Sequence, residues 1–230
     1  MDIILVPGLW LEASSWDDVV PALVAAGHRP LPLTLPGVGE PAERSANVGM
    51  SDWVAAVVEK IDAADGPVVL VGHSGGGNVV WGAADARPDQ VARVVFVDTV
   101  PPPPESGISS FAPVDGVVPF PGWDFFPDED VSDLDAQTRA RTLPLTRSVP
   151  ARVPSDPVPL SGERHRVPVT MLMGRMDRHQ LEAELDQWGA YAEEYRAIGD
   201  VTVEKIGSGH WPQFSQPGRL AALIAESVSQ

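Results

Sequence analysis

A serine nucleophile held in a tight turn is indicated by residues 72–76, whose sequence is GHSGG. A buried strand is predicted just before this turn, at 68–71, and a helix is predicted after it, reaching about residue 86. The turn forces strained backbone angles on Ser74, so glycine is expected at 72 and 76, where a side chain would clash. The hydroxyl of Ser74 is therefore predicted to stand above a sheet edge, where it can attack a carbonyl carbon.

A serine hydroxyl is a weak nucleophile at neutral pH and needs a base within hydrogen-bond reach, which in turn needs an orienting acid. Among five histidines, His210 follows the last predicted strand, in the segment 207–212, GSGHWP, at the same carboxyl edge of the sheet as Ser74. We therefore predict His210 as the base. The remaining histidines are expected to have structural roles: His28, His73, His165 and His179.

Two aspartates that follow predicted strands compete for the role of the acid. Asp177 follows the strand predicted at 167–173 and stands between Ser74 and His210 in the chain, in the order that this kind of triad uses on parallel sheets. Asp98 ends the strand predicted at 91–97 and is the alternative. The sequence favours Asp177. No metal site is predicted, because the spacing of the nearby His and Glu side chains matches no strong metal-binding motif.

Two backbone N–H groups are expected to stabilise the oxyanion that forms when the serine attacks. Gly75 supplies one of them, because it follows the nucleophile at the start of a helix. The loop after the first strand supplies the other, and Pro7 has no N–H to donate. Leu9 is therefore the predicted second donor, with Trp10 as the next choice.

The elements that must position these residues alternate along the chain. Strands are predicted at 3–6, 31–35, 68–71, 91–97, 167–173 and 201–206, and helices at 16–26, from 51 to the Gly-Pro pair at 66–67, after 74, at 181–197 and at 217–228. This alternation predicts an α/β fold with a doubly wound, mostly parallel sheet. Residues 1–98 and 167–230 then form the core.

Residues 99–166 interrupt the alternation and are predicted to be an inserted segment. They are rich in proline, and one helix is expected near 133–143. The acidic run 128–135 is interpreted as a solvated helix face. Aromatic residues in the insertion and beside the catalytic loops, together with His73, are the candidate substrate pocket: Trp10, His73, Phe111, Trp123, Phe125, Phe126 and Trp211.

With these residues in place, the chain resembles the α/β-hydrolase superfamily, in its serine-hydrolase, esterase-like branch. The matching segments are LVPGLW at 5–10, LPGVG at 35–39, GHSGG at 72–76, GRMD at 174–177 and GHWP at 209–212. Many relatives have His-Gly where this chain has Pro7-Gly8. The resemblance implies that residues 99–166 form a cap over the site and that no cofactor is needed.

The expected reaction is hydrolysis of a carboxylic ester or lactone of a small apolar substrate through an acyl-enzyme. One alternative is a lyase or carbon–carbon bond hydrolase of the hydroxynitrile-lyase type, which would use the same triad for proton transfer. Another is a ligand-binding or biosynthetic member of the fold that does not hydrolyse its ligand, since a fold does not fix a function.

Composition narrows the remaining possibilities. The chain has 230 residues, 43% of them hydrophobic, which suits one globular domain, and it lacks cysteine, which excludes disulfides and a cysteine nucleophile. Its net charge of -16 disfavours nucleic acid and anionic membranes as partners. No signal sequence or membrane span is recognised. We expect a cytoplasmic monomer or homodimer that acts on a small molecule.

Overall fold

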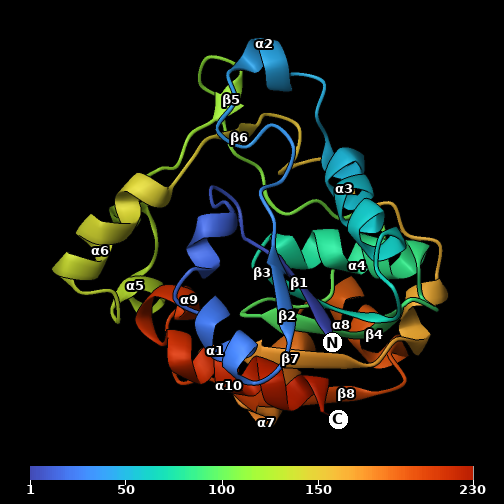
Figure 1. The fold of residues 1–230 in the computed structure, drawn as a ribbon. Helices are drawn as coiled ribbons and strands as arrows, with labels where there is room; N and C mark the ends of the chain where they lie inside the picture. The colour runs from blue at the N-terminus through green and yellow to red at the C-terminus, as the bar shows by residue number, and fades with distance from the viewer. Residues whose placement is uncertain (230) are drawn as a thin grey trace.

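Six strands form one sheet at the centre of the computed structural model, which describes residues 1–229 (Figure 1). Their order across the sheet is β2-β1-β3-β4-β7-β8, and every neighbouring pair is parallel. The strands are β1 (Asp2–Val6), β2 (Arg29–Pro32), β3 (Val68–His73), β4 (Val91–Val97), β7 (Val169–Met173) and β8 (Val201–Lys205). The doubly wound α/β class predicted from the alternation is confirmed.

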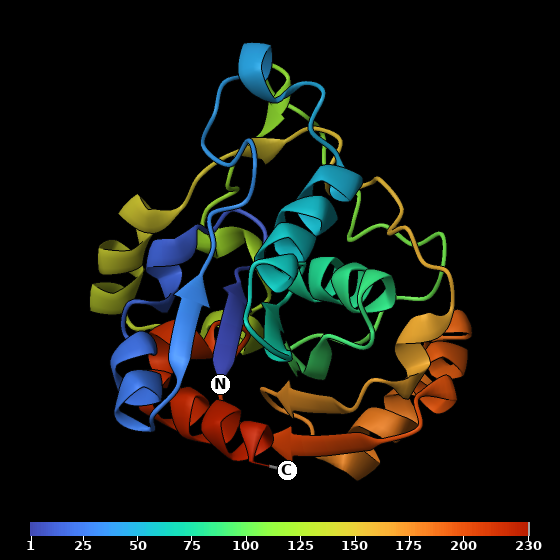
Figure 2. The same cartoon turned by 45° about the vertical axis from the view of Figure 1, so that its right-hand side comes forward.

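Helices cover both faces of this sheet, as can be followed in Figure 2. Because side chains of a strand alternate between faces, Ile3 and Leu5 pack with α1 (Val20–Ala25) and α10 (Pro217–Val228) on one side. Ile4 and Val6 face the other side, toward α3 (Met50–Asp62) and α4 (Gly76–Ala86). Burial on both faces explains why the central strands read as continuous apolar runs.

Two predicted helices are each divided in the structure. The segment predicted as a helix at 16–26 is a 3-10 turn, η1 (Ala13–Trp16), followed by α1, which has a proline in its first turn. The helix predicted at 181–197 is α7 (Arg178–Leu185) and α8 (Ala190–Ala197), separated at Gly189, whose φ is +52°. Gly189 is the residue just before α8, and its positive φ is incompatible with one continuous α-helix through this segment.

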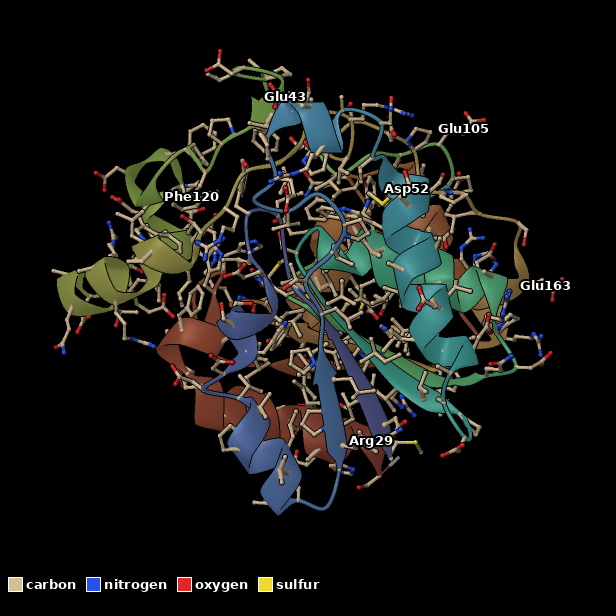
Figure 3. The ribbon with its side chains drawn as sticks, turned by 45° about the horizontal axis from the view of Figure 1, so that its top comes forward. Arg29, Glu43, Asp52, Glu105, Phe120 and Glu163 are labelled. Atoms are coloured by element: carbon tan, nitrogen blue, oxygen red, sulfur yellow. The ribbon has the colours of Figure 1, made fainter. Side chains whose placement is uncertain are left out.

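The chain leaves the sheet after β4 and returns to it at β7, so residues 99–166 form one continuous excursion. Its elements are β5 (Val117–Val118), η2 (Trp123–Phe125), α5 (Asp128–Val131), α6 (Ala136–Thr142), η3 (Leu143–Leu145), β6 (Val149–Pro150) and η4 (Glu163–Arg166). β5 and β6 pair antiparallel, a small sheet absent from the sequence expectation, whereas α6 lies within the helix expected near 133–143. The excursion extends across the molecule, from Phe120 on one side to Glu163 on the other (Figure 3).

Two short helices complete the described chain, α2 (Ala42–Ser45) and α9 (Pro212–Ser215). Among residues 1–229, no helix combines the length and the apolar character needed to cross a membrane.

Candidate active site

Ser74 lies in the turn between β3 and α4, in the conformation that its motif predicts. Its φ is +49°, in the left-handed region, and its N–H donates to the carbonyl of Val97 at 3.1 Å. A Cβ placed on Gly72 would lie 2.6 Å from the carbonyl oxygen of Gly76, and one on Gly76 would lie 2.6 Å from that of Val6. Only glycine fits at both positions, and the tight turn holds the serine at the carboxyl edge of the sheet.

His210 is hydrogen-bonded on both sides of its ring. Its Nε2 lies 2.9 Å from the Oγ of Ser74, and its Nδ1 lies 2.6 Å from Oδ2 of Asp98. A carboxylate can only accept, so Nδ1 carries the proton and Nε2 is left to accept the hydrogen of the serine hydroxyl. This is the tautomer that a general base toward Ser74 requires.

Asp98 is held by β4 and β7. It follows β4 directly with φ +46°, its N–H donates to Leu172, and its Oδ1 accepts the N–H of Gly174 at 2.7 Å. Burial alone would raise the pKa of Asp98. The hydrogen bond from His210, the electrostatic attraction of the His210 imidazole and the hydrogen bond from the Gly174 N–H outweigh burial, so the pKa of Asp98 lies below its ordinary value. The carboxylate therefore remains charged beside the imidazole.

The expectation that Asp177 orients His210 is wrong in this structure. Asp177 is exposed at the start of α7, where its carboxylate accepts the N–H of Gln180 at 2.9 Å and the side chain of Gln180 accepts the N–H of Asp177 in return. This capping box satisfies the helix terminus. Both aspartates follow strands, and spacing along the chain did not separate the capping residue from the partner of His210.

His73 is buried beneath the serine and does not line a pocket. Its Nε2–H donates to the carbonyl of His210 at 2.7 Å, and its Nδ1 accepts from the Nε2 of Gln213 at 3.2 Å. Burial, together with the nearby imidazole of His210, lowers the pKa of His73 from 6.5 to about 3, so the ring is neutral. The assignment of His73 to the substrate pocket is thus corrected: it supports the backbone of His210.

The two N–H groups expected to hold an oxyanion border the turn of Ser74. A Cβ placed on Gly75 would lie 3.2 Å from Cγ of Leu9, and one on Gly8 would lie 3.0 Å from Cβ of Ser74, so the loop after β1 packs directly on this turn. Within residues 1–229, neither the N–H of Leu9 nor that of Gly75 donates a hydrogen bond. Both remain available to a ligand.

A cavity of ≈ 500 Å³ opens at Ser74. Its lining residues come from the serine turn and α4, from the chain after β4, and from the segment before α8 and α8 itself: Ser74, Gly75, Asn78, Thr99, Val100, Gly107, Ile108, Trp188 and Tyr191. A Cβ on Gly75 would lie 2.8 Å from Cδ1 of Ile108, which places the side chain of Ile108, near the start of the excursion, against the Cα of Gly75. No charged side chain is among these lining residues.

One family model matches this chain over nearly its whole length. The model of the family described as "Alpha/beta hydrolase family" matches residues 3–223. The chain belongs to the alpha/beta hydrolase family.

The relatives of this alpha/beta hydrolase family member include proteins named as esterases. The chain is 37% identical over 103 residues to the carbendazim hydrolyzing esterase of Nocardioides sp. (strain SG-4G), a match covering 44% of this chain and 43% of that protein. It is 41% identical over 103 residues to esterase PIR7B of Oryza sativa subsp. japonica, covering 43% of this chain and 38% of that protein. These matches span less than half of the length of either relative.

A solved structure of a methylesterase from Arabidopsis is similar over the whole chain. Its TM-score is 0.73 at 22% identity, and the similarity covers 100% of this chain and 99% of that one. At this identity the likeness concerns the fold.

In this alpha/beta hydrolase the predicted aromatic residues pack on one another instead of lining the cavity at Ser74. The ring of Trp10 contacts Phe111 at a centroid distance of 4.9 Å, and Phe126 contacts Trp211 at 4.6 Å. Trp123 lies 5.1 Å from Trp211 in a small buried cluster with Leu11 and Phe214. Phe125 is 59% exposed. None of the six aromatic residues expected to form the substrate pocket lines this cavity: Trp10, Phe111, Trp123, Phe125, Phe126 and Trp211.

The acidic run 128–135 contacts the loop that carries His210, residues 207–211. The N–H of His210 donates to the carbonyl of Asp130 at 2.9 Å, and the N–H of Gly209 donates to Oδ2 of Asp133 at 2.7 Å. Burial raises the pKa of Asp130. The acidic run is therefore not only a solvated helix face, as expected, since Asp130 and Asp133 also bind the loop of His210. Sequence reasoning had no signal for this contact, because it depends on α5 packing against a loop distant in the chain.

The residues found at the cavity but not predicted are Asn78, Thr99, Ile108, Trp188 and Tyr191. Its position in the first turn of the helix that follows the serine turn is a signal that could have identified Asn78. Asp177, His179 and Glu182 do not form a metal-binding group, and among residues 1–229 no cluster of three or more His, Asp or Glu side chains does.

Proposed function

We propose that this chain is a serine hydrolase that cleaves a carboxylic ester or lactone of a small, uncharged and mainly apolar substrate. The observation that carries the proposal is the pair of hydrogen bonds in series, Ser74 to His210 at 2.9 Å and His210 to Asp98 at 2.6 Å. The esterase names of the relatives support the same class of reaction.

The geometry supports acyl transfer in two stages. His210 takes the hydroxyl proton as Ser74 Oγ attacks the carbonyl carbon, and Asp98 stabilises the imidazolium that forms. The N–H groups of Leu9 and Gly75 stabilise the oxyanion, and they are free of other acceptors in residues 1–229. His210 then returns the proton to the leaving alcohol, and water, activated by the same imidazole, releases the acid from the serine.

The chemistry of the cavity supports a neutral substrate. The lining residues carry no charge, and several are apolar or aromatic, including Val100, Ile108 and Trp188. The chain's net charge of -16 repels anionic molecules over longer distances. Residues 99–166 act as a cap in this proposal, because Ile108 lies over Gly75. A cytoplasmic location and a monomeric or homodimeric state stay predictions of the sequence.

A panel of p-nitrophenyl esters and lactones, graded by acyl length, tests the proposal. We expect hydrolysis by the unmodified chain and loss of turnover in Ser74→Ala, with the fold retained by circular dichroism. Cleavage of a cyanohydrin or a vinylogous diketone without any ester hydrolysis would favour the lyase alternative. Ester hydrolysis that persists in Ser74→Ala would contradict the proposal.

A further inference from the structure

One polar side chain at the cavity has no function in the reaction as described. Asn78 lies in the first turn of α4, four residues after Ser74 in the chain, and only 6% of its surface is exposed. It lines the cavity at Ser74, and its side-chain amide has no hydrogen-bond partner among residues 1–229. Its backbone N–H is satisfied by the carbonyl of Gly75.

The amide of Asn78 is open to the cavity, because neither of its polar atoms is among the fully buried side-chain atoms that lack a partner in residues 1–229. Water can therefore hydrogen-bond to the amide while the cavity is empty of substrate. A substrate that displaces this water without offering a polar atom in its place leaves the amide unpaired and binds less tightly. The amide of Asn78 therefore points to a polar atom that a ligand brings into the cavity.

The position of the cavity indicates which part of the substrate that atom belongs to. The cavity borders Ser74, to which the acyl group is attached, and Gly75, toward whose N–H the oxyanion points. His210 is not among the lining residues of the cavity. The leaving alcohol must lie near His210 to receive a proton. The acyl chain therefore occupies the cavity, where the side chain of Asn78, which lines the same cavity as Ser74, can contact it.

We propose that Asn78 determines substrate specificity by hydrogen-bonding a hydroxyl or carbonyl oxygen on the acyl chain of a neutral ester. An amide both donates and accepts, so it suits a hydroxyl as well as a ketone oxygen. No cation lines the cavity to pair with a carboxylate. The substrate class is thus esters of short hydroxy or oxo acids. The inference rests on the proposed function.

Pairs of esters that differ only by a hydroxyl in place of a methyl group test the inference. The probes are p-nitrophenyl 3-hydroxybutanoate against 3-methylbutanoate, and p-nitrophenyl lactate against isobutyrate, each corrected for its rate of spontaneous hydrolysis. The quantity measured is the ratio of kcat/KM within a pair. In Asn78→Leu, which keeps the size and removes the amide, we expect this ratio to fall about 10-fold for at least one pair.

The matched control is Asn47→Leu, because Asn47 is the only other asparagine in the chain and is exposed after α2. It should leave both ratios unchanged. A second variant, Asn78→Ala, should lower the ratio in the same direction and guards against an effect of leucine's shape. Equal ratios in the unmodified chain, Asn78→Leu and Asn78→Ala would overturn the inference.

The experiment separates this inference from the proposed function. If the unmodified chain hydrolyses the esters through Ser74 but the ratios do not respond at position 78, only the specificity role fails. If the unmodified chain hydrolyses none of the esters and Ser74 is not labelled by a fluorophosphonate, the proposed function fails and the inference falls with it.

Discussion

The imidazole of His210 is hydrogen-bonded to the carboxylate of Asp98 at 2.6 Å, although the two residues are 112 positions apart in the chain. Each stands at the carboxyl edge of the parallel sheet, Asp98 directly after β4 and His210 in the loop after β8. The sheet order brings β7 next to both β4 and β8, so the N–H of Gly174 at the end of β7 fixes the carboxylate from one side.

The first prediction separates the two aspartates. Asp98→Asn should lower kcat/KM for an ester by about three to four orders of magnitude, because an amide beside Nδ1 favours the wrong tautomer of His210. Asp177→Asn should leave kcat/KM nearly unchanged, since Asn caps a helix about as well as Asp. Steady-state kinetics on both variants measures the contrast. A large loss in Asp177→Asn with little effect of Asp98→Asn would reverse the assignment.

The second prediction concerns the hydrogen bond between Asp133, just after α5, and the loop 207–211, which carries His210. Asp133→Ala removes the acceptor of the Gly209 N–H, so the loop should become less ordered and kcat should fall several-fold with little change in KM. The control is Asp128→Ala, because Asp128 is exposed and belongs to the same acidic run, at the start of α5. Amide hydrogen exchange of the loop 207–211 should increase only in Asp133→Ala. Equal kinetics and exchange in the two variants would exclude a positioning role for Asp133.

The third prediction is a pH dependence of stability that originates at His73. Its pKa of about 3 in the folded chain lies below the ordinary 6.5, so the unfolded chain binds the proton first as the pH falls. The contribution of neutral His73 to the free energy of unfolding is present in full above pH 6.5. It is lost as the pH falls from 6.5 toward 3, by roughly 1.4 kcal/mol per pH unit. His73→Gln should remove this slope from the free energy of unfolding.

Urea denaturation at several pH values between about 6 and 4.5 measures that slope, in a window above most carboxyl titrations. Contributions from groups common to both proteins cancel in the difference between the unmodified chain and His73→Gln. Parallel plots of unfolding free energy against pH for the two proteins would show that His73 is not held neutral by burial.

The fourth prediction concerns a buried ion-pair cluster remote from the triad. The guanidinium of Arg164, 2% exposed, is bound by both carboxylate oxygens of Glu194 at 2.7 Å and by Asp85 at 3.3 Å. Glu194→Ala leaves this buried cation short of a partner and should destabilise the chain by about 3–5 kcal/mol in urea denaturation. The neighbouring exposed Glu193→Ala should cost less than about 0.5 kcal/mol. Similar losses in both variants would contradict this account.

Ser74 and His210 could be found from the sequence because each is marked by local chemistry. The glycines around Ser74 are required by the turn itself, and His210 follows a strand whose apolar pattern is clear. Asp98 was harder to assign, since the sequence placed two aspartates after strands. The hydrogen bonds at each position decide between them: Asp98 accepts from His210 and from the N–H of Gly174, whereas Asp177 caps α7. These tertiary contacts are not contained in the local sequence pattern.

The walls of the cavity were the least predictable part. Aromatic composition favours residues such as Phe111 and Trp123, but the ring of Phe111 packs on Trp10 and that of Trp123 packs on Trp211. Such packing buries apolar surface without any ligand. Trp188 lines the cavity instead, from the segment between α7 and α8. The sequence pattern predicts one continuous helix over this segment, so it gives no sign that Trp188 lies at the cavity.

The most direct test of the account is covalent labelling with a fluorophosphonate, followed by intact mass and peptide mapping. We predict one adduct per chain, located on Ser74, with labelling slowed by orders of magnitude in His210→Ala and abolished in Ser74→Ala. An adduct on another residue, or none at all in the folded, unmodified chain, would contradict a serine activated by His210.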